Sequence, residues 1–503
     1  MKPLFQERIC GVVAAATARE MLAQLGLALK RTRTIELRLD WLRDEGELVL
    51  FLGWLGKHRP RATLIATCRR REAGGKFRGD LATQLAILRL AVACGCTRVD
   101  IEVESAERFP GGTLQRLLGD AGTLISFHDF NRTPSSARLR ALARRLGQCE
   151  GDAIKIATQC PSLRDAVRVL ATCRGRRNVV AVPMGEAAQP ARVLALAHGS
   201  ALAYAAAGEK TAPGQLTLEE MKRLYHADTL DRRTRIYGVI GDPVAHSLSP
   251  VMHNTGFQAR GMNAVYLPFL VRGLGDFLEA IEPLGIAGFS VTLPHKERIL
   301  RHLDGCDPLA AAIGAVNTVV VRGRGKLYGY NTDYVGVLRV IERRLPLRGS
   351  RVLLVGAGGA ARAVAFALAQ GGAVVCVCSR RAARAKALAR SVRGELVERR
   401  RLAREFFDAI VNCTPVGMHP RVKDSPLAAR ELNARIVFDL IYRPRQTRLL
   451  QLAEQRGIET ISGVEMFLAQ GAAQWEIWNG MRAPEKVMRK AVMKALRDED
   501  VRK

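Results

Sequence analysis

The stretch RVLLVGAGGAARAVAFALAQGGAVVCVCSRR, residues 351–381, predicts two strands joined by a glycine turn and a helix. Its apolar run Val352–Val355 has the length of a buried parallel strand, and a cluster of glycines follows at once. Glycines let the backbone approach a pyrophosphate closely, and the helix that follows points its free N–H groups at that group. The stretch therefore predicts a dinucleotide-binding unit.

The end of the second strand indicates which dinucleotide binds. An acidic residue usually holds the ribose hydroxyls at this point, but this chain has Ser379, Arg380 and Arg381. Arginine binds a 2′-phosphate well, so the sequence favours NADP over NAD. The alternative to a dinucleotide-binding unit is a glycine turn with a structural role in another kind of doubly wound sheet.

Length and composition bound the class of protein. A chain of 503 residues exceeds one ordinary domain and predicts two to four. Apolar residues make up 48% of it without a long apolar run, and the N-terminus has no leader pattern, so we expect a soluble, cytoplasmic protein without a membrane span. The 11 cysteines are scattered without a metal-ligand spacing, so we expect reduced thiols and no metal site.

The formal net charge of +30 raises the question of nucleic-acid binding. The basic residues are spread along the whole chain, and aromatic residues, which stack on bases, make up only 5% of it. We therefore expect small anionic substrates and a phosphorylated cofactor as ligands, and no nucleic acid. The sequence leaves the oligomeric state unknown.

Strand-like runs recur at intervals of about 25 to 30 residues between Arg8 and Ala207. They are ICGVVAAAT, TIELRLD, ATLIATC, RVDIEVE, TLISFHD, AIKIAT, NVVAVPMG and ALAYAAA. Segments of helical periodicity separate most of them, and this alternation matches a (β/α)8 barrel. The polar segment His226–Thr234 is the expected linker to a second α/β region that starts at Ile236.

Polar residues cluster at the C-terminal ends of the predicted barrel strands, where barrel enzymes carry their chemistry. Lys155 lies within an apolar strand, where a lysine is costly unless it is paired or functional. Once deprotonated, such a lysine is a nucleophile for a carbonyl, and His128 is placed to move a proton beside the resulting iminium. These residues alone allow a Schiff-base aldolase as readily as a dehydratase.

Motifs within residues 5–225 resemble those of type I 3-dehydroquinate dehydratases. They are IELRLD, TCR followed by GGKFRG, SFHDFNRTP, IKIA, PMG with the downstream Arg192, and TAPGQ. The resemblance implies that Lys155 forms the Schiff base with the substrate ketone, that His128 is the general acid and base, and that Arg192 binds the substrate carboxylate. It also implies further substrate contacts, which are Glu36, Arg38, Arg69 and Gln215.

Two positions depart from this family's pattern. The family's glutamate directly precedes the paired glycines, whereas here Ala73 stands before Gly74 and Glu72 is displaced by one residue. Thr211, a further implied substrate contact in TAPGQ, stands where the family often has serine. The first departure puts an assisting carboxylate in question, and neither changes the lysine and histidine pair.

Four motifs lie upstream of the glycine turn, namely GDPVAHSLSP, VTLPHK, AVNTVV and GYNTDYVG. Each ends a strand or opens a helix with polar side chains, where an anion can bind hydroxyl and backbone N–H groups. Lys296 and Asp333 are the pair best able to share a proton, which the reduction of a ketone by hydride requires. Ser247 and Ser249 both face a carboxylate if their segment is extended.

These motifs resemble those of shikimate dehydrogenases, and the resemblance continues through NCTPVGM, FDLIYRP and GVEMFLAQGAAQ. It implies that Lys296 is the principal catalytic residue, with Asp333 as its hydrogen-bonding partner, and that Ser247 and Ser249 bind a carboxylate. Further substrate contacts are implied for Thr292, Asn317, Tyr442 and Gln470. NADP contacts are implied for Gly356, Ala357, Gly358, Gly359, Ala360, Ser379, Arg380, Arg381, Thr414, Met418 and Gly463. The family's adenosine-phosphate clamp reads NRT, whereas this chain has SRR, so the contact on the base side can differ.

Together the two resemblances imply an α/β chain with two functional halves. Residues 1–228 are expected to form a (β/α)8 TIM barrel, residues 234–345, completed by 463–503, a substrate-binding domain, and residues 346–462 a Rossmann NADP-binding domain. The first half is expected to dehydrate 3-dehydroquinate to 3-dehydroshikimate, and the second to reduce this product to shikimate with NADPH. Three alternatives remain: an aldolase-like barrel joined to a quinate-preferring dehydrogenase, a regulatory protein with one inactive half, and a nucleic-acid-binding protein.

Overall fold

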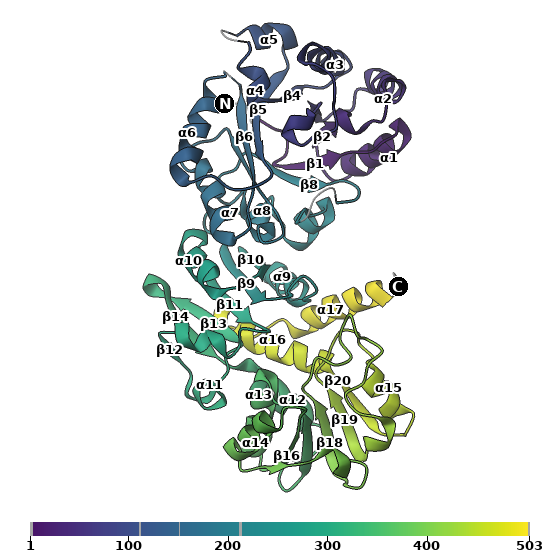
Figure 1. Cartoon of the computed structure of the whole chain (residues 1–503), viewed down its shortest axis with the longest axis vertical. Helices are drawn as coiled ribbons and strands as arrows, with labels where there is room; N and C mark the ends of the chain where they lie inside the picture. Colours follow the sequence, from purple (N-terminus) through teal and green to yellow (C-terminus); the bar gives the residue numbers. More distant parts are fainter. Residues whose placement is uncertain (1–3, 110–111, 150, 211–213, 501–503) are drawn as a thin grey trace. The chain divides into compact units, whose positions relative to one another are not determined.

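The structure is a computed structural model that describes residues 4–109, 112–149, 151–210 and 214–500 (Figure 1). It divides into two compact units, which comprise residues 1–235 with 269–285 and residues 236–268 with 286–503. One eight-stranded and two six-stranded sheets organise the described residues. None of the described helices combines the length and hydropathy that crossing a membrane requires.

The first sheet is a parallel barrel in the order β7-β6-β5-β4-β3-β2-β1-β8. It is nearly closed, and at the seam the Ala201 N–H donates to the Val179 carbonyl at 2.8 Å. All eight strands expected from the sequence are confirmed. Their bounds are β1 (Ile9–Val13), β2 (Thr34–Arg38), β3 (Thr63–Thr67), β4 (Arg98–Glu102), β5 (Gly122–Asp129), β6 (Ala153–Gln159), β7 (Val179–Met184) and β8 (Ala203–Ala206).

Helices follow most of the barrel strands, and several begin at polar side chains that cap their free N–H groups. Thr17, Asp44 and Asp80 each accept a hydrogen bond from the backbone three residues on, which satisfies a donor that the helix itself leaves unpaired. The helices of this region are α1 (Ala18–Leu29), α2 (Glu45–His58), α3 (Leu81–Ala93), α4 (Val103–Ala106), α5 (Thr113–Leu118), α6 (Ser136–Gly147), α7 (Leu163–Leu170) and α8 (Gln189–Leu194).

An apolar cluster packs together residues of several barrel strands. It comprises Phe5, Cys10, Val12, Ile65, Leu124, Ala153, Val180, Leu202 and Tyr204. Removal of this apolar surface from water is the main favourable contribution to the stability of such a core. The charged side chains Glu36, Asp100 and Lys155 are also buried, and Lys155 Nζ lies 4.2 Å from the ring of the cluster residue Tyr204.

The second sheet has the order β10-β9-β11-β13-β14-β12 and mixes parallel and antiparallel pairs. Its strands are β9 (Arg235–Gly241), β10 (Ala264–Leu270), β11 (Ile286–Val291), β12 (Gly305–Cys306), β13 (Thr318–Arg322) and β14 (Lys326–Tyr330). The helices along this part of the chain are α9 (Ser249–Ala259), α10 (Leu274–Leu284), which belongs to the first compact unit, α11 (Pro308–Ile313) and α12 (Thr332–Ile341). The C-terminal helices α16 (Gly463–Asn479) and α17 (Glu485–Asp500) return to contact α9, as the helical pattern of the tail predicts (Figure 1).

The third sheet is parallel throughout and has the order β17-β16-β15-β18-β19-β20. Numbered from its own first strand, this is the order 3-2-1-4-5-6 of a Rossmann fold, in which ligands bind where the order reverses, between the first and fourth strands. The strands are β15 (Arg351–Val355), β16 (Val374–Cys378), β17 (Glu395–Leu396), β18 (Phe407–Asn412), β19 (Ala434–Asp439) and β20 (Glu459–Ser462). The helices are α13 (Gly359–Gln370), α14 (Ala382–Ser391) and α15 (Arg448–Glu454).

Candidate active sites

Lys155 lies in the middle of β6 with its side chain inside the barrel, and it is only 6% exposed. Its Nζ donates to Glu36 Oε1 at 3.2 Å and to Asp100 Oδ2 at 3.1 Å. The same Nζ lies 4.2 Å from the ring centroid of Tyr204. Two carboxylates and an aromatic face therefore surround the predicted nucleophile in a nearly dry site.

Arg69 and Asp100 connect the lysine to the neighbouring strands. Arg69 Nη2 donates to Asp100 Oδ1 at 2.6 Å, and its Nη1 donates to Ser126 Oγ at 2.6 Å. Burial alone would raise the pKa of the Asp100 carboxyl, but the charges of Arg69 and Lys155 outweigh it and hold that pKa below its ordinary value. Asp100 thus stays ionised between two cations.

Sequence analysis missed Asp100. Its signal is the strand RVDIEVE, in which Asp100 and Glu102 alternate with apolar residues and so share one face. Both are buried, and Glu102 lies 3.3 Å from Arg69. Two acidic residues on the inner face of a barrel strand indicate a charged site rather than a solvated surface.

His128 lies near the end of β5, two residues beyond Ser126, which pairs with Lys155 on β6. Burial, reinforced by the positive charges of Arg69 and Lys155, lowers the pKa of His128 well below its ordinary value. Its Nδ1 is buried and has no hydrogen-bond partner among the described residues. The imidazole is therefore neutral near pH 7 and available as a base.

The displaced glutamate does not replace the missing carboxylate. Glu72 is an exposed residue whose Oε2 lies 3.5 Å from Arg70 Nε, and no contact joins it to His128 in the described residues. A Cβ at Gly74 would clash with the Phe130 ring at 2.2 Å, so the backbone of this turn fits tightly against the loop after β5.

The other predicted substrate residues of the barrel are distributed around the same rim. Arg192 on α8 is buried, donates through Nε to the Pro183 carbonyl at 2.8 Å, and forms no ion pair with a described acidic residue. Burial lowers its pKa to about 10, so it remains a cation at neutral pH. Arg38 binds Asp40 through two hydrogen bonds, Gln215 is buried, and Thr211 lies outside the described residues.

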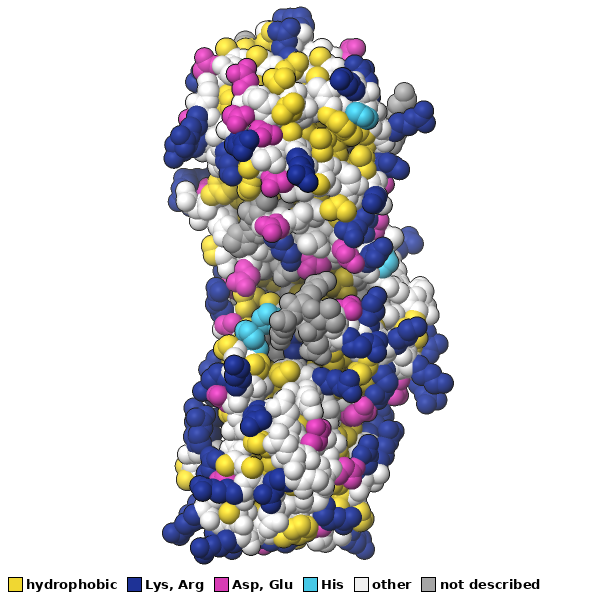
Figure 2. All heavy atoms as spheres, turned by 90° about the vertical axis from the view of Figure 1, so that its right-hand side faces the viewer, with side chains coloured by type: hydrophobic (Ala, Val, Ile, Leu, Met, Phe, Trp, Pro, Cys, Tyr) yellow, Lys and Arg dark blue, Asp and Glu magenta, His cyan; other side chains and the backbone are white. Residues whose placement is uncertain are grey.

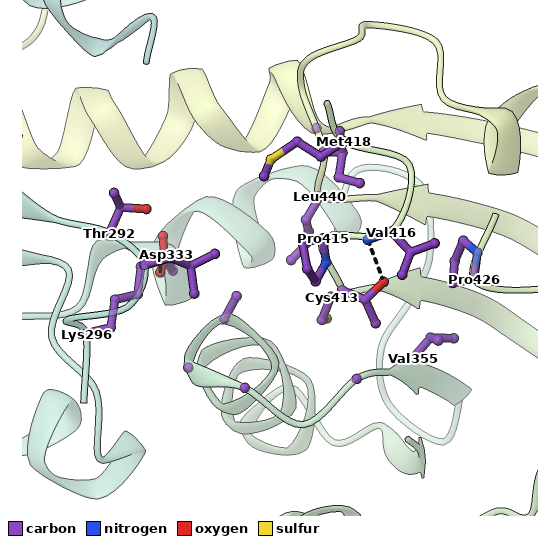
Figure 3. A pocket seen from close by; sticks show the side chains of 18 of the residues that line it. Thr292, Lys296, Asp333, Val355, Cys413, Pro415, Val416, Met418, Pro426 and Leu440 are labelled. Carbon is purple, nitrogen blue, oxygen red and sulfur yellow. Dashed lines mark hydrogen bonds and ion pairs between the residues drawn. The ribbon is translucent and has the colours of Figure 1, made fainter. Parts of the chain in front are cut away.

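A cavity of about 1460 Å³ lies in the second unit. Every residue predicted for the dehydrogenase half lines it. From the substrate-binding side these are Ser247, Ser249, Thr292, Lys296, Asn317, Asp333, Tyr442 and Gln470. From the cofactor side they are Gly356, Ala357, Gly358, Gly359, Ala360, Ser379, Arg380, Arg381, Thr414, Met418 and Gly463. Figure 3 shows Thr292, Lys296 and Asp333 on one side and Cys413, Pro415 and Val416 on the other.

Lys296 and Asp333 form a direct pair, with Lys296 Nζ donating to Asp333 Oδ2 at 2.6 Å. Asn317 Nδ2 donates to the other carboxylate oxygen at 2.8 Å, and Asn331 Oδ1 accepts from the Asp333 backbone at the start of α12. The Asp333 carboxylate is thus held through both of its oxygens. It holds the Lys296 ammonium in turn, and both Lys296 and Thr292 line the cavity.

The two serines lie in the cavity wall, but their segment is not extended as our alternation argument required. Leu248 between them has φ −87° and ψ 0°, and Ser249 is the first residue of α9. The Ser249 N–H donates to Ser247 Oγ at 3.2 Å. The segment is a helix-opening turn because the following Pro250 favours the first turn of a helix.

The cofactor side is built around the N-terminus of α13. Gly356 has φ +119°, which only glycine adopts readily, and a Cβ there would lie 3.1 Å from Thr414 Cγ2. No side chain caps the first N–H groups of α13. A pyrophosphate could therefore lie close to the backbone at Gly356 and accept hydrogen bonds from the free N–H groups of α13.

Arginines gather where β16 ends. Arg380, Arg381 and Arg384 line the cavity next to Ser379. Sequence analysis missed Arg384, which lies in the first turn of α14 (Ala382–Ser391). Ser379 and these three cationic side chains fit a 2′-phosphate on the ribose better than a free diol.

Gln474 is a second residue that sequence analysis missed. It lies on α16, is buried, and lines the cavity. Its Oε1 accepts from Ser290 Oγ at 2.9 Å, and its Nε2 donates to Thr318 Oγ1 at 3.1 Å and to the Asn317 carbonyl at 3.3 Å. It therefore ties the C-terminal helix to the strand end that carries Asn317.

Basic side chains outside these sites form no single surface patch on the face seen in Figure 2. Lys and Arg lie over all of this face, interspersed with Asp and Glu. Several arginines are paired, such as Arg145 with Glu107 at 2.6 Å and Arg489 with Glu465 at 2.7 Å. On this face the basic residues are therefore distributed rather than gathered at one place.

A buried lysine on a barrel strand and a lysine–aspartate pair beside a dinucleotide fold define a chain with two α/β enzyme modules. Family models match both. Type I 3-dehydroquinase matches residues 9–232, the shikimate dehydrogenase substrate binding domain residues 239–319, shikimate/quinate 5-dehydrogenase residues 339–447, and the shikimate 5′-dehydrogenase C-terminal domain residues 463–493. The chain is 36% identical to the bifunctional 3-dehydroquinate dehydratase/shikimate dehydrogenase, chloroplastic, of Arabidopsis thaliana, over 95% of this chain and 83% of that one. It belongs to this bifunctional family.

Two comparisons concern the second half alone. The NADP(+) shikimate dehydrogenase of Thermococcus kodakarensis is 42% identical over 53% of this chain and 98% of its own. A crystal structure of a shikimate dehydrogenase in complex with NADP+ has a TM-score of 0.50 and 36% identity, covering 53% of this chain and 98% of that one. The fold class expected from the sequence is confirmed.

Proposed function

We propose that this chain catalyses two consecutive reactions, the dehydration of 3-dehydroquinate in the barrel and the NADPH-dependent reduction of the resulting 3-dehydroshikimate in the second unit. The observation that carries the proposal is the presence, in one chain, of Lys155 between two buried carboxylates and of the Lys296–Asp333 pair in a dinucleotide cleft. The ketone left by the first reaction is the group that the second reduces.

In the barrel, neutral Lys155 Nζ attacks the substrate ketone, and the ketone oxygen takes up one proton from Nζ and one from solvent and leaves as water to give a cationic iminium. The iminium withdraws electrons, so His128, which is neutral and partly buried, removes the proton on the adjacent carbon. The hydroxyl β to the iminium then departs with a proton from His128. Hydrolysis of the iminium restores the lysine, so the net change is the loss of one water.

Charged residues around Lys155 hold the substrate in this scheme. Arg192 has no acidic partner among the described residues and binds the substrate carboxylate. Glu36, Arg38, Arg69 and Gln215 contact the ring hydroxyls. Asp100 keeps Arg69 in place and balances the charge of the iminium, because it stays ionised beside both cations.

In the second unit, NADPH supplies a hydride to the carbonyl carbon when it is bound. The free N–H groups of α13 hold its pyrophosphate, and Arg380, Arg381 and Arg384 hold its 2′-phosphate. Lys296 donates the proton to the developing alkoxide, and Asp333 holds its Nζ in position. Ser247 and Ser249 bind the substrate carboxylate at the helix-opening turn.

We assign the dehydratase to residues 1–228 and the dehydrogenase to residues 234–345 with 463–503 and 346–462, which are the domains expected from the sequence. The ligands in this proposal are 3-dehydroquinate, 3-dehydroshikimate, shikimate and NADP, and nucleic acid is not among them. A cytoplasmic location remains a prediction, and the Arabidopsis thaliana relative is described as chloroplastic.

The test is reduction with borohydride in the presence of 3-dehydroquinate, followed by mass mapping of the peptides, alongside assays of NADP-linked oxidation of shikimate and of quinate. We expect an adduct on Lys155 and oxidation of shikimate. An adduct on another lysine contradicts the dehydratase mechanism. Faster turnover of quinate than of shikimate contradicts the assigned substrate of the second unit.

A further inference from the structure

Tyr204 lies on β8 next to the predicted nucleophile of the barrel. Its side chain is 8% exposed, its ring belongs to the apolar cluster of the barrel interior, and the ring centroid is 4.2 Å from Lys155 Nζ. Its hydroxyl oxygen is buried and has no hydrogen-bond partner among the described residues. One side chain thus combines an aromatic face for a cation with an unsatisfied donor.

A buried hydroxyl without a partner is unfavourable, since it has lost its hydrogen bonds to water and gained none in exchange. A phenylalanine would fill the same space without this cost. Burial, together with the negative charge of Glu36, raises the pKa of the Tyr204 phenol well above its ordinary value, so the phenol stays protonated. It is therefore a permanent donor whose acceptor is absent from the described part of the protein.

The ring face has a separate effect. An aromatic face attracts a cation through its quadrupole, and the attraction is stronger in a site without water. Both the Lys155 ammonium and the iminium formed from it carry a positive charge on Nζ, whereas the neutral amine and the carbinolamine do not. A face at this distance stabilises the iminium relative to these neutral species.

We propose that Tyr204 is a further catalytic residue of the dehydratase, whose ring stabilises the Lys155 iminium and whose hydroxyl donates a hydrogen bond to an oxygen of the substrate held on that lysine. The inference rests on the proposed dehydratase function. The acceptor belongs to the substrate because the phenol lies beside the nitrogen to which the substrate becomes bonded.

The experiment compares Tyr204→Phe, which removes only the hydroxyl, with Tyr204→Leu, which also removes the ring. Both are made in the full chain, and each is assayed for dehydratase kcat and KM and for the amount of borohydride-trapped Lys155 adduct. We expect Tyr204→Phe to lower kcat about tenfold while the trapped adduct stays at the wild-type amount. We expect Tyr204→Leu to lower the trapped adduct as well, by about tenfold at a fixed time.

Tyr225→Phe is the matched control, because Tyr225 is also buried but has no contact with Lys155 among the described interactions. It should leave dehydratase kcat and KM unchanged. Dehydrogenase activity, measured on every variant, and circular dichroism show whether the chain has folded.

Wild-type kcat and KM in Tyr204→Phe would overturn the role of the hydroxyl and would mean that a water molecule satisfies it. Wild-type trapping in Tyr204→Leu would overturn the role of the ring. Failure of the wild-type protein to form a Lys155 adduct contradicts the proposed function itself, so the two failures are distinguishable.

Discussion

The two candidate sites place a catalytic lysine in opposite surroundings. Lys155 lies inside a barrel among Glu36, Asp100 and Tyr204, and its side chain is 7% exposed. Lys296 lies on the wall of an open cavity with one carboxylate partner, and its side chain is 16% exposed. The lysine that we propose as a covalent nucleophile is enclosed by charge, whereas the lysine that we propose as a proton donor is held by a single oriented partner.

The largest expected effect tests whether the two sites work independently. Lys155→Ala removes the nitrogen that we propose forms the iminium, so dehydration should fall by about three orders of magnitude or more while shikimate oxidation is spared. Lys296→Ala should have the reverse effect because it removes the proton donor of the second site. Both activities are measured on each purified variant. Loss of both in either variant would show that the halves are coupled.

Asp100→Asn tests whether charge enclosure matters for the barrel site. The substitution removes the carboxylate that Arg69 and Lys155 share and leaves them only Glu102 and Glu36 as counter-charges, so dehydratase kcat should fall about 100-fold and the barrel should unfold at a lower temperature. Steady-state kinetics and thermal unfolding measure the two effects. Glu107→Gln, in an exposed pair with Arg145, is the control and should change neither. A normal kcat in Asp100→Asn would mean that Arg69 alone organises the site.

Arg380→Ala tests the open cleft, where we expect a smaller effect that is confined to one ligand. Loss of a charged contact to the 2′-phosphate should raise KM for NADP about tenfold and leave KM for NAD unchanged. Arg384→Ala should do the same to a lesser degree. Arg390→Ala, at the other end of α14 and outside the cavity lining, is the control. Equal effects on NADP and NAD would contradict the assigned phosphate clamp.

Asp439 makes the stability of the second unit depend on pH. It is buried on β19, accepts from Asn412 and Thr447, and Asn412 in turn accepts from Thr414 of the cofactor side. Burial raises its pKa from 3.8 to about 6, so the folded domain keeps a proton that the unfolded chain has released, and stability falls as the pH rises through this interval.

Asp439→Asn removes this titration. The temperature at which dehydrogenase activity is lost should therefore change less between pH 5 and pH 7 in the variant than in the wild type, by about 2–4 °C. Heat-inactivation curves at the two pH values measure the difference. Parallel shifts in both proteins would show that another group causes the pH dependence.

The smallest expected effect concerns the displaced glutamate. Glu72 has a side chain that is 75% exposed, and it pairs only with Arg70 among the described residues, so Glu72→Ala should change dehydratase kcat by less than about twofold. Steady-state assays of the variant and of the wild type settle this point. A tenfold loss would show that the turn closes over His128 during catalysis.

Features that depend on residues close together in the sequence could be predicted from the sequence. Short local patterns predict the eight barrel strands, the glycine turn at Gly356 and the lysine of β6. Such patterns exist because buried strands and helix N-termini each require particular residue types within a few positions. The residues predicted for the second-half site all line one cavity, and each belongs to a motif of several residues; their roles stay predictions.

Only the tertiary structure decided which side chains meet. Asp100 contacts Lys155, which is 55 positions away in the sequence. Tyr204 contacts the same lysine from β8, the last strand of the barrel. Ser247 and Ser249 share a wall through a helix turn that strand alternation did not predict. The sequence by itself determined the elements and the chemical groups, because these depend on local periodicity and residue type. Barrel closure and sheet order determined the partners, because such contacts join residues that are distant along the chain.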